Sequence, residues 1–310
     1  VSPCIGAGSA AYATGTDIDG EPWADPPCIG ADQIVPGLAT GPLTMRIDAA
    51  HTNVAVGFAV RLAAHNQGPI LSSVWDFGDG TVLTNQPFVG HAWSLPGEYT
   101  VRLTGFNESE PLGASATIVV HVIEDVYYVK RANPTPVFPY TTWATAAANI
   151  QDAIEASTLP GRLVLVTNGV YQTGVVRTNS GGIEWQSRIG LWNGVLVRSV
   201  NGPRATVIDG RGVIRCALVH AEGVLSGFTL TNGGGYGSAG GAWCSRLGAL
   251  TNCLLAGNSN SGVNGGTLYN CTLSGNSNGG AYYSVLYYCT LTGNQTDYGG
   301  GGACCCTLYR

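Results

Sequence analysis

The sequence predicts an all-β protein in which a β-sandwich is followed by a parallel β-helix. Residues 35–124 consist of short segments of alternating apolar and polar side chains separated by turn residues, which is typical of a sandwich. Later residues repeat with a period near 20, which is typical of a solenoid. The composition agrees, because Gly contributes 46 residues and charged residues only 11%, a profile that favours tight turns over long polar helices.

A turn motif stands inside the predicted sandwich, where residues 75–81 read WDFGDGT. Asp76 and Asp79 suit side-chain-to-backbone hydrogen bonds in a tight turn, and Gly78 and Gly80 permit positive φ. Trp75 alternates with them and is expected to point into the core. HAW at residues 91–93 and PGEYTV at 96–101 follow. Together these segments resemble the PKD (polycystic-kidney-disease-type) domain, which implies an immunoglobulin-like sandwich over residues 35–124.

A single amphipathic helix is expected over about residues 142–158. Trp143, Ala147, Ile150 and Ile154 recur at helical spacing, and the Pro-Gly pair at 160–161 ends the pattern. A lone helix before a repetitive β region predicts a cap over the first coil of a solenoid.

Two sets of residues recur every 18 positions. Cys253, Cys271 and Cys289 form one set, and Asn258, Asn276 and Asn294 form the other. Coils of a β-helix stack about 4.8 Å apart, so equivalent residues align in ladders. We therefore expect a ladder of buried thiols and a ladder of hydrogen-bonded amides. A metal site at the three cysteines is the alternative, and a zinc or redox role for Cys304–Cys306 is disfavoured because strand alternation sends the middle side chain to the opposite face.

Earlier coils are expected to have a longer period. Val197 and Val219 are 22 residues apart, as are Ile208 and Leu230, and we expect each pair to align in neighbouring coils.

Residues 125–310 resemble the right-handed parallel β-helix repeats of large surface proteins in Verrucomicrobia and Lentisphaerae. The likeness rests on WATAA at 143–147, NIQDAI at 149–154, VTNGVY at 166–171 and LSGFTL at 225–230. It implies a right-handed solenoid on the cell surface. A left-handed helix of 18-residue coils is the structural alternative, but its usual aliphatic hexapeptide pattern is missing.

Both chain ends carry β-helix features. Residues 1–34 resemble the final coil and closing loop of the same family, and Cys4 and Cys28, which bracket one loop there, are a candidate disulfide. Residues 307–310 align with 267–270, so we expect the β-helix to be open at its C-terminal end. The candidate assembly residues are Cys4, Ile5, Ile29, Thr307, Leu308 and Tyr309.

Charge and composition argue against several classes of function. The net charge is −5 and Lys130 is the only lysine, so a nucleic-acid partner is not expected. No apolar run is long enough to span a membrane. Glycoside hydrolysis generally needs a pair of nearby carboxylates, whereas Glu222 and Asp297 are the only acidic residues from 212 to 310. We expect no enzymatic activity, no cofactor and no metal.

These observations predict an extracellular or cell-surface structural protein. Open β-helix ends must be capped or paired, so the chain is expected to associate with itself head to tail, as a scaffold or filament subunit, or to be one window of a tandem array. An adhesin that binds cell-surface glycans is the alternative, and a fragment of a polysaccharide-active enzyme is a third reading. The aromatic residues available for adhesion are Tyr282, Tyr283, Tyr287, Tyr288 and Trp243.

Overall fold

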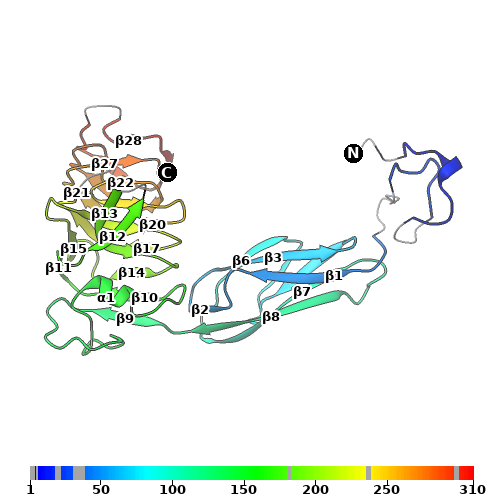
Figure 1. Cartoon of the computed structure of the whole chain (residues 1–310), viewed down its shortest axis with the longest axis horizontal. Helices are drawn as coiled ribbons and strands as arrows, with labels where there is room; N and C mark the ends of the chain where they lie inside the picture. The colour runs from blue at the N-terminus through cyan, green and yellow to red at the C-terminus, as the bar shows by residue number, and fades with distance from the viewer. Residues whose placement is uncertain are drawn as a thin grey trace. The chain divides into compact units, whose positions relative to one another are not determined.

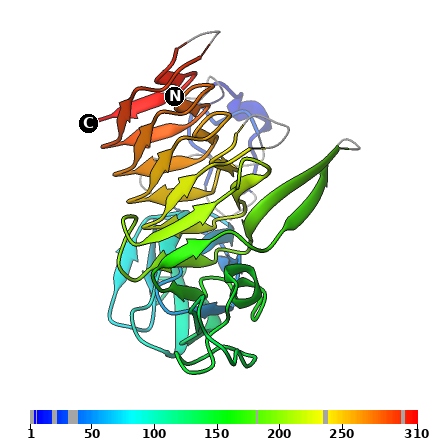
Figure 2. The ribbon, with the colours of Figure 1, turned by 90° about the vertical axis from the view of Figure 1, so that its left-hand side faces the viewer.

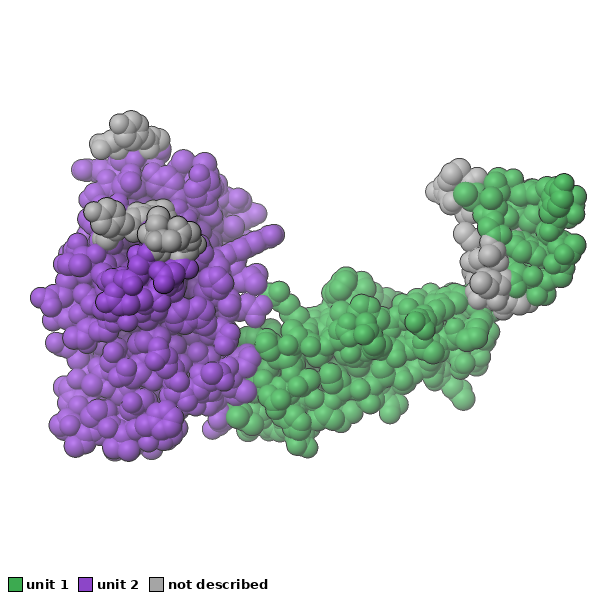
Figure 3. All heavy atoms as spheres, in the orientation of Figure 1, with its two compact units in different colours: residues 1–123 green, residues 124–310 purple. Residues whose placement is uncertain are grey.

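The computed structural model describes residues 4, 6–17, 22–30, 39–180, 183–234, 239–296 and 300–310. The chain divides into two compact units, residues 1–123 and residues 124–310, which Figure 3 shows in different colours. Strands dominate both, and the helices among the described residues are the 3₁₀ turn η1 (Ala10–Tyr12) and helix α1 (Ile150–Ile154). Neither is long and apolar enough to cross a membrane.

Unit 1 contains a β-sandwich of two sheets (Figure 1). One sheet has the strand order β1-β3-β6 and the other the order β2-β8-β7-β4-β5. Only the β2–β8 pair is parallel among these neighbours. The strands are β1 (Thr44–Ala49), β2 (Asn53–Ala55), β3 (Val60–Gln67), β4 (Ser72–Asp76), β5 (Val82–Thr84), β6 (Phe88–His91), β7 (Gly97–Phe106) and β8 (Ala114–Ile123).

The sandwich core lies between the two sheets. Val60 and Leu62 of β3 and Val101 and Leu103 of β7 are buried, and the residues between them are exposed. This alternation is what a strand with one face on the core requires. The predicted sandwich is therefore confirmed, with strands running from Thr44 to Ile123.

The described residues of the segment 1–34 contain η1 and one isolated bridge, between Thr16 and Pro22, but no strand. The segment is closed instead by backbone hydrogen bonds such as Ile29 N–H to the Cys4 carbonyl, at 2.9 Å. A single coil has no neighbouring coil with which to form a ladder, so strands are not expected within it. Its assignment as a β-helix coil stays a prediction, and Ile5 lies outside the described residues.

Unit 2 contains three sheets in its described residues, and nearly all of their strand pairs are parallel. The first has the order β29-β26-β23-β20-β17-β14-β10-β9, the second β11-β15-β18-β21-β24-β27 and the third β12-β13-β16-β19-β22-β25-β28. From β14 onward, successive strands belong to the first, the second and the third sheet in turn, and this order repeats. Figure 2 shows the resulting stack of coils, with the antiparallel hairpin β12–β13 projecting from its side.

The strands of the first sheet are β9 (Val126–Val129), β10 (Leu163–Val166), β14 (Leu196–Ser199), β17 (Val224–Ser226), β20 (Ala249–Thr251), β23 (Thr267–Tyr269), β26 (Val285–Tyr287) and β29 (Thr307–Tyr309). Those of the second are β11 (Gly169–Tyr171), β15 (Thr206–Asp209), β18 (Thr229–Thr231), β21 (Leu254–Ala256), β24 (Thr272–Ser274) and β27 (Thr290–Thr292). Those of the third are β12 (Val176–Ser180), β13 (Ile183–Leu191), β16 (Arg215–Val219), β19 (Ala242–Cys244), β22 (Val263–Asn264), β25 (Ala281–Tyr282) and β28 (Ala303–Cys304).

The strand register tests the predicted alignments. Ile208 is paired with Leu230, as predicted, and Leu268 and Leu308 lie in one row with Leu286 between them. The Val197–Val219 alignment is wrong, because Val197 pairs with Leu225 while Val219 belongs to another sheet. The coil between β14 and β17 is longer than 22 residues. The residue 22 positions after Val197 therefore falls in a different sheet.

The predicted helix over about 142–158 is too long, since α1 spans only Ile150–Ile154. Ala147 is committed to a strand-like bridge with Val129, because its N–H donates to the Tyr128 carbonyl and its carbonyl accepts from Lys130. Asn149 then caps α1, its side chain accepting from Gln151 N–H at 3.1 Å. The backbone of Ala147 is thus used by the sheet and cannot form helical hydrogen bonds.

Candidate functional site

The predicted amide ladder is present in the interior of unit 2. Asn258 Nδ2 donates to Asn276 Oδ1 at 2.8 Å, and Asn276 Nδ2 donates to Asn294 Oδ1 at 2.8 Å. Each amide also donates to a backbone carbonyl of the preceding coil, as from Asn276 to Leu255 at 3.0 Å. Asn258 and Asn276 are fully buried, so these bonds replace water completely and hold one coil to the next.

A column of glycines makes room for this ladder. A Cβ atom at Gly262 would lie 2.9 Å from Asn276 Nδ2 and 2.7 Å from the Gly280 carbonyl oxygen. Gly280 stands in the same relation to Asn294, with a distance of 2.9 Å. Their 18-residue step, equal to that of the asparagines, is the signal that could have identified them.

The predicted thiol ladder is also present. Cys253 and Cys271 are buried and Cys289 is half-buried, and each thiol donates to the carbonyl two residues before it at 3.3 Å. Hydrogen bonds with both neighbouring thiols, and then burial, raise the pKa of Cys271. The hydrogen bond with Cys271 lowers the pKa of the outermost thiol, Cys289, to about 7.

Cys304 ends β28, and Cys305 and Cys306 form the corner before β29. The Cys305 residue has φ 53° and is exposed, whereas Cys306 donates its thiol to the carbonyls of Ala281 and Cys304. Ser284 makes the equivalent bonds one coil earlier, to Gly265 and Tyr282. Cys306 thus continues a corner position in which a short side chain bonds to the backbone of two coils. No group of three His, Cys, Asp or Glu side chains suited to a metal occurs in the described part of the chain.

The edge formed by β27, β28 and β29 exposes residues whose equivalents are buried. Leu268 and Leu286 are 0% and 1% exposed, whereas Leu308 in the same row is 61% exposed. Thr307 and Tyr309 beside it are exposed as well. The Tyr309 ring stacks on Tyr287 at 4.5 Å. At the predicted N-terminal assembly end, Cys4 and Ile29 are exposed.

The aromatic residues considered for adhesion are spread over several surfaces. Tyr283 and Tyr288 are each 67% exposed, and Tyr282 is half-buried. Tyr287 is sandwiched between Tyr269 and Tyr309 in a stack of nearly parallel rings. Because the faces of Tyr287 are covered by its neighbours, this ring has no free face to offer a sugar.

The turn of unit 1 has the predicted chemistry. Asp76 accepts from Gly78 N–H and Asp79 from Thr81 N–H, both at 2.9 Å. Gly78 and Gly80 have φ values of 76° and 89°, and Trp75 is fully buried.

Asp79 has a second partner, because His91 Nε2 lies 2.8 Å from its other carboxylate oxygen. The His91 ring stacks on Phe77 at 4.1 Å, which ties the turn to the core. Burial alone would raise the pKa of Asp79, but the hydrogen bonds from Thr81 and His91 outweigh it and the net shift is downward. These partners occupy both oxygens, so the turn is explained without a bound cation.

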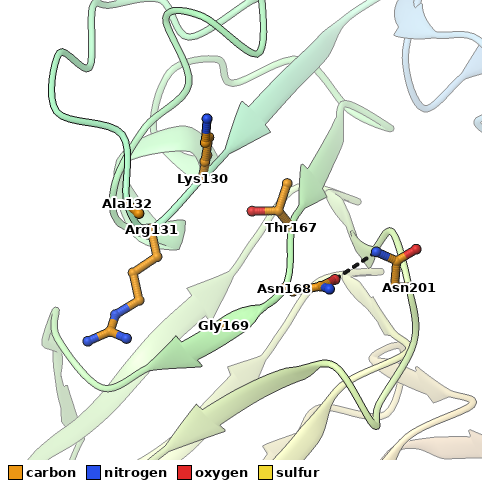
Figure 4. A pocket seen from close by; sticks show the side chains of 7 residues that line it. All are labelled: Lys130, Arg131, Ala132, Thr167, Asn168, Gly169 and Asn201. Atoms are coloured by element: carbon orange, nitrogen blue, oxygen red, sulfur yellow. Dashed lines mark hydrogen bonds between the residues drawn. The ribbon is translucent and has the colours of Figure 1, made fainter.

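A depression of about 690 Å³ lies beside β9 and β10 (Figure 4). Lys130 and Arg131 line it, but their side chains point away from each other. Asn168 and Asn201, opposite, are joined by a hydrogen bond of 2.7 Å. The depression therefore offers hydrogen-bonding groups, but the charged groups of Lys130 and Arg131 do not point to one common place in it.

Three carboxylates of unit 2 are engaged in local structural bonds. Asp125 accepts from the Tyr127 and Ser157 hydroxyls, both at 2.7 Å. Glu184 pairs with Arg177, and Asp209 accepts from Arg211 N–H at 2.7 Å. Each is thus held in a local structural bond.

Cys4 is exposed and Cys28 is buried. The hydrogen bond from Ile29 to Cys4 brings their segments together. Their disulfide stays a prediction.

Comparison with known proteins identifies part of unit 1. Residues 44–120 match the family model described as the PKD domain. Among solved structures, the PKD1 domain of Vibrio anguillarum Epp is similar at 22% identity, over 26% of this chain and 95% of that one, with a TM-score of 0.21. No curated protein matches the chain. The PKD resemblance is confirmed for residues 44–120, and the resemblance to β-helix surface proteins stays a prediction.

Proposed function

We propose that unit 2 is a right-handed parallel β-helix and that the chain is a non-enzymatic structural protein of the cell surface or extracellular space. The fixed rotation through three sheets and the parallel pairing of successive coils support the β-helix. Helix α1 would act as a cap, because its buried residues Ile150 and Ile154 pack into the same core as the strands. PKD domains are typical of extracellular and surface proteins, which supports the location.

The observation that carries the scaffold role is the edge at β27–β29. Burying a leucine side chain is worth about 1.5–3 kcal/mol, and Leu308 is 61% exposed there. Exposed sheet edges that are not blunted are templates for further pairing. No lysine, glutamate or proline stands in β27, β28 or β29 to prevent it.

Backbone donors point to the same conclusion. Gly257 and Gly275 N–H donate forward to the next coil, to Ser274 and Thr292. Asn258 N–H and Asn276 N–H likewise donate to the side chain of the next asparagine, at 3.2 and 3.1 Å. The equivalent donors of the last coil are Gly293 and Asn294, and a further coil would supply their acceptors.

In the proposed assembly, that further coil would belong either to another stretch of one long polypeptide or to a neighbouring copy. In the second case, residues 1–34 of one copy would complete the edge of the next, near Cys4 and Ile29. Such a contact is heterologous and does not close, so it would generate a fibre. Both cases would support a scaffold built by coil stacking.

Negative-stain electron microscopy of native material, combined with mass analysis under denaturing conditions, tests the role. Fibres that dissolve into chains of about this size would support stacking between copies. Fibres of far longer chains would support a tandem array. Compact, monodisperse particles would contradict the scaffold.

A variant of the β27–β29 edge distinguishes a specific contact from nonspecific association through exposed apolar side chains. Leu308→Asp places a charge in the proposed contact and is expected to abolish fibres of the recombinant chain, because burying an unpaired charge is costly. Leu112→Asp is the matched control, since Leu112 is 95% exposed and lies in unit 1. Equal fibre yield from the two variants would show that β29 is not the contact.

A further inference from the structure

A cleft of about 420 Å³ lies where the hairpin β12–β13 meets the neighbouring strands β16 and β19 of the third sheet of unit 2. This volume is in the range of small-molecule sites. Its lining is dominated by aromatic rings and one guanidinium, with Thr178 and Leu218 beside them; the rings and the guanidinium belong to Trp185, Trp192, Trp243, His220 and Arg215. Among the residues that the structure describes, no carboxylate lines it.

The backbone is shaped to accommodate the tryptophans. A Cβ atom at Gly190 would lie 2.1 Å from the Trp192 ring, so the missing side chain gives the indole its place over β13. Gly190 is paired with Leu218, and Leu218 with Trp243. The three positions form one row across the sheet, and Trp243 also stacks with His220 at 6.1 Å and 16°.

The hairpin supplies the opposite side of the cleft. Trp185 is paired with Thr178, which also lines the cleft, so both lie on one face of the hairpin. Glu184 lies one residue along the strand and therefore on the other face. There it pairs with Arg177 and accepts from Gln186 at 2.7 Å. The nearest carboxylate in the sequence is thus directed away from the cleft.

Arg215 is the charged group of the cleft and has an unusual environment. It is only 6% exposed, and its Nε donates to the Ala239 carbonyl at 3.1 Å. Its guanidinium lies 5.7 Å from the centre of the Trp185 ring. Burial lowers its pKa, and no carboxylate contributes an opposing effect. A buried cation normally has an anionic partner, and within the described residues Arg215 has none.

We propose that this cleft binds an acidic sugar residue, a pyranose ring that carries a carboxylate. The C–H groups of such a ring carry partial positive charge and pack on the negative face of an indole, for which Trp243 and Trp192 are placed. The carboxylate is a bidentate acceptor that matches the guanidinium of Arg215. A cationic ligand would be repelled by Arg215, and a neutral sugar would leave the guanidinium without its counter-ion.

This inference goes beyond the scaffold role and gives a site to the adhesive alternative. The cleft lies at β13, β16 and β19, whereas the stacking edge lies at β27–β29. Either proposal can therefore fail without the other, since fibre formation and sugar binding are measured separately.

Titration of the full chain with uronic acid trisaccharides, followed by tryptophan fluorescence and calorimetry, tests the site. The probes are trigalacturonate, trimannuronate and triglucuronate, each compared with its neutral methyl ester. At least one acid is expected to bind at least about tenfold more tightly than its ester, which corresponds to about 1.4 kcal/mol. Added salt should weaken that binding, because the interaction with Arg215 is ionic.

Two variants locate the binding. Trp243→Ala and Trp185→Ala should each reduce the affinity at least about tenfold. Trp185 is on the projecting hairpin, so its replacement leaves the stacked coils intact even if Trp243→Ala disturbs them. Trp143→Ala is the matched control, because Trp143 packs on Tyr128 outside the cleft. The proposal is overturned if no uronate binds, if acid and ester bind equally, or if Trp185→Ala binds as the unaltered chain does.

Discussion

Asp79 joins the local turn of unit 1 to its core. One carboxylate oxygen accepts from Thr81 N–H and the other contacts His91. Asp79→Asn should destabilise unit 1 by about 1 kcal/mol at pH 7, the usual value of a hydrogen bond to a partly exposed group. Urea unfolding of the full chain, with hydrogen exchange of the β4 and β7 peptides to assign the transition, measures this. Asp48→Asn is the control, because the surface pairs of Asp48 with Arg46 and His65 should contribute little.

The effect of pH on this stability has a definite sign. The pKa of Asp79 is lower in the folded chain than its unfolded value of about 3.9. The contribution of the carboxylate is therefore complete above about pH 4 and is lost as the pH falls through the folded pKa. The difference between Asp79→Asn and the unaltered chain should shrink below pH 4. A difference that grew in acid would contradict the assignment.

Hydrogen bonds within a single turn can be predicted from the sequence. The turn bonds of Asp76 and Asp79 depend on residues two positions away, so WDFGDGT predicts them. The contact between Asp79 and His91 was not predicted, because it depends on how β6 packs beside the turn. Arg215 gave no signal either, since its burial depends on a hairpin that the repeat pattern does not contain.

At the scale of the strands and coils, the ladder of asparagine amides joins one coil to the next. Asn276→Ala removes the acceptor of Asn258 Nδ2 and the donor to Asn294 and Leu255. Each buried group left without a partner costs about 1–3 kcal/mol, so we expect unit 2 to lose about 3 kcal/mol or more. The urea midpoint of the transition assigned to β24 by hydrogen exchange is the measurement.

Asn278→Ala is the matched control in the same coil. Asn278 is exposed and only accepts from Thr296 at 3.3 Å, so a change within about 0.5 kcal/mol is expected. A similar loss from both variants would mean that the buried amide ladder does not stabilise unit 2.

At this scale the sequence predicts regular coils better than irregular ones. The 18-residue step aligned Cys and Asn correctly, because those coils have equal lengths. The Val197–Val219 alignment failed where coil length changes, and the helix was overextended because helical spacing at Ala147 coincides with a bridge to Val129. The hairpin β12–β13, and with it the aromatic cleft, departs from the repeat altogether.

At the scale of the whole molecule, the PKD domain at residues 44–120 and the parallel sheets of unit 2 define two kinds of β structure. In the proposed β-helix each coil contacts only its neighbours, so an end without a cap leaves its last coil without a partner on one side. The exposed Leu308 side chain and the forward donors of the last coil therefore bear directly on the proposed assembly. The sequence suggested this edge through the alignment of residues 307–310 with 267–270.

Hydrogen exchange at Gly293 and Asn294 in native assembled protein tests this central claim most directly. If a further coil stacks on β27–β29, both N–H groups should exchange at least about tenfold more slowly than in the dissociated chain. Gly275 and Asn276 serve as internal references, because their donors already have acceptors in the next coil. Fast exchange at Gly293 and Asn294 in the native material, beside protected references, would contradict assembly by coil stacking.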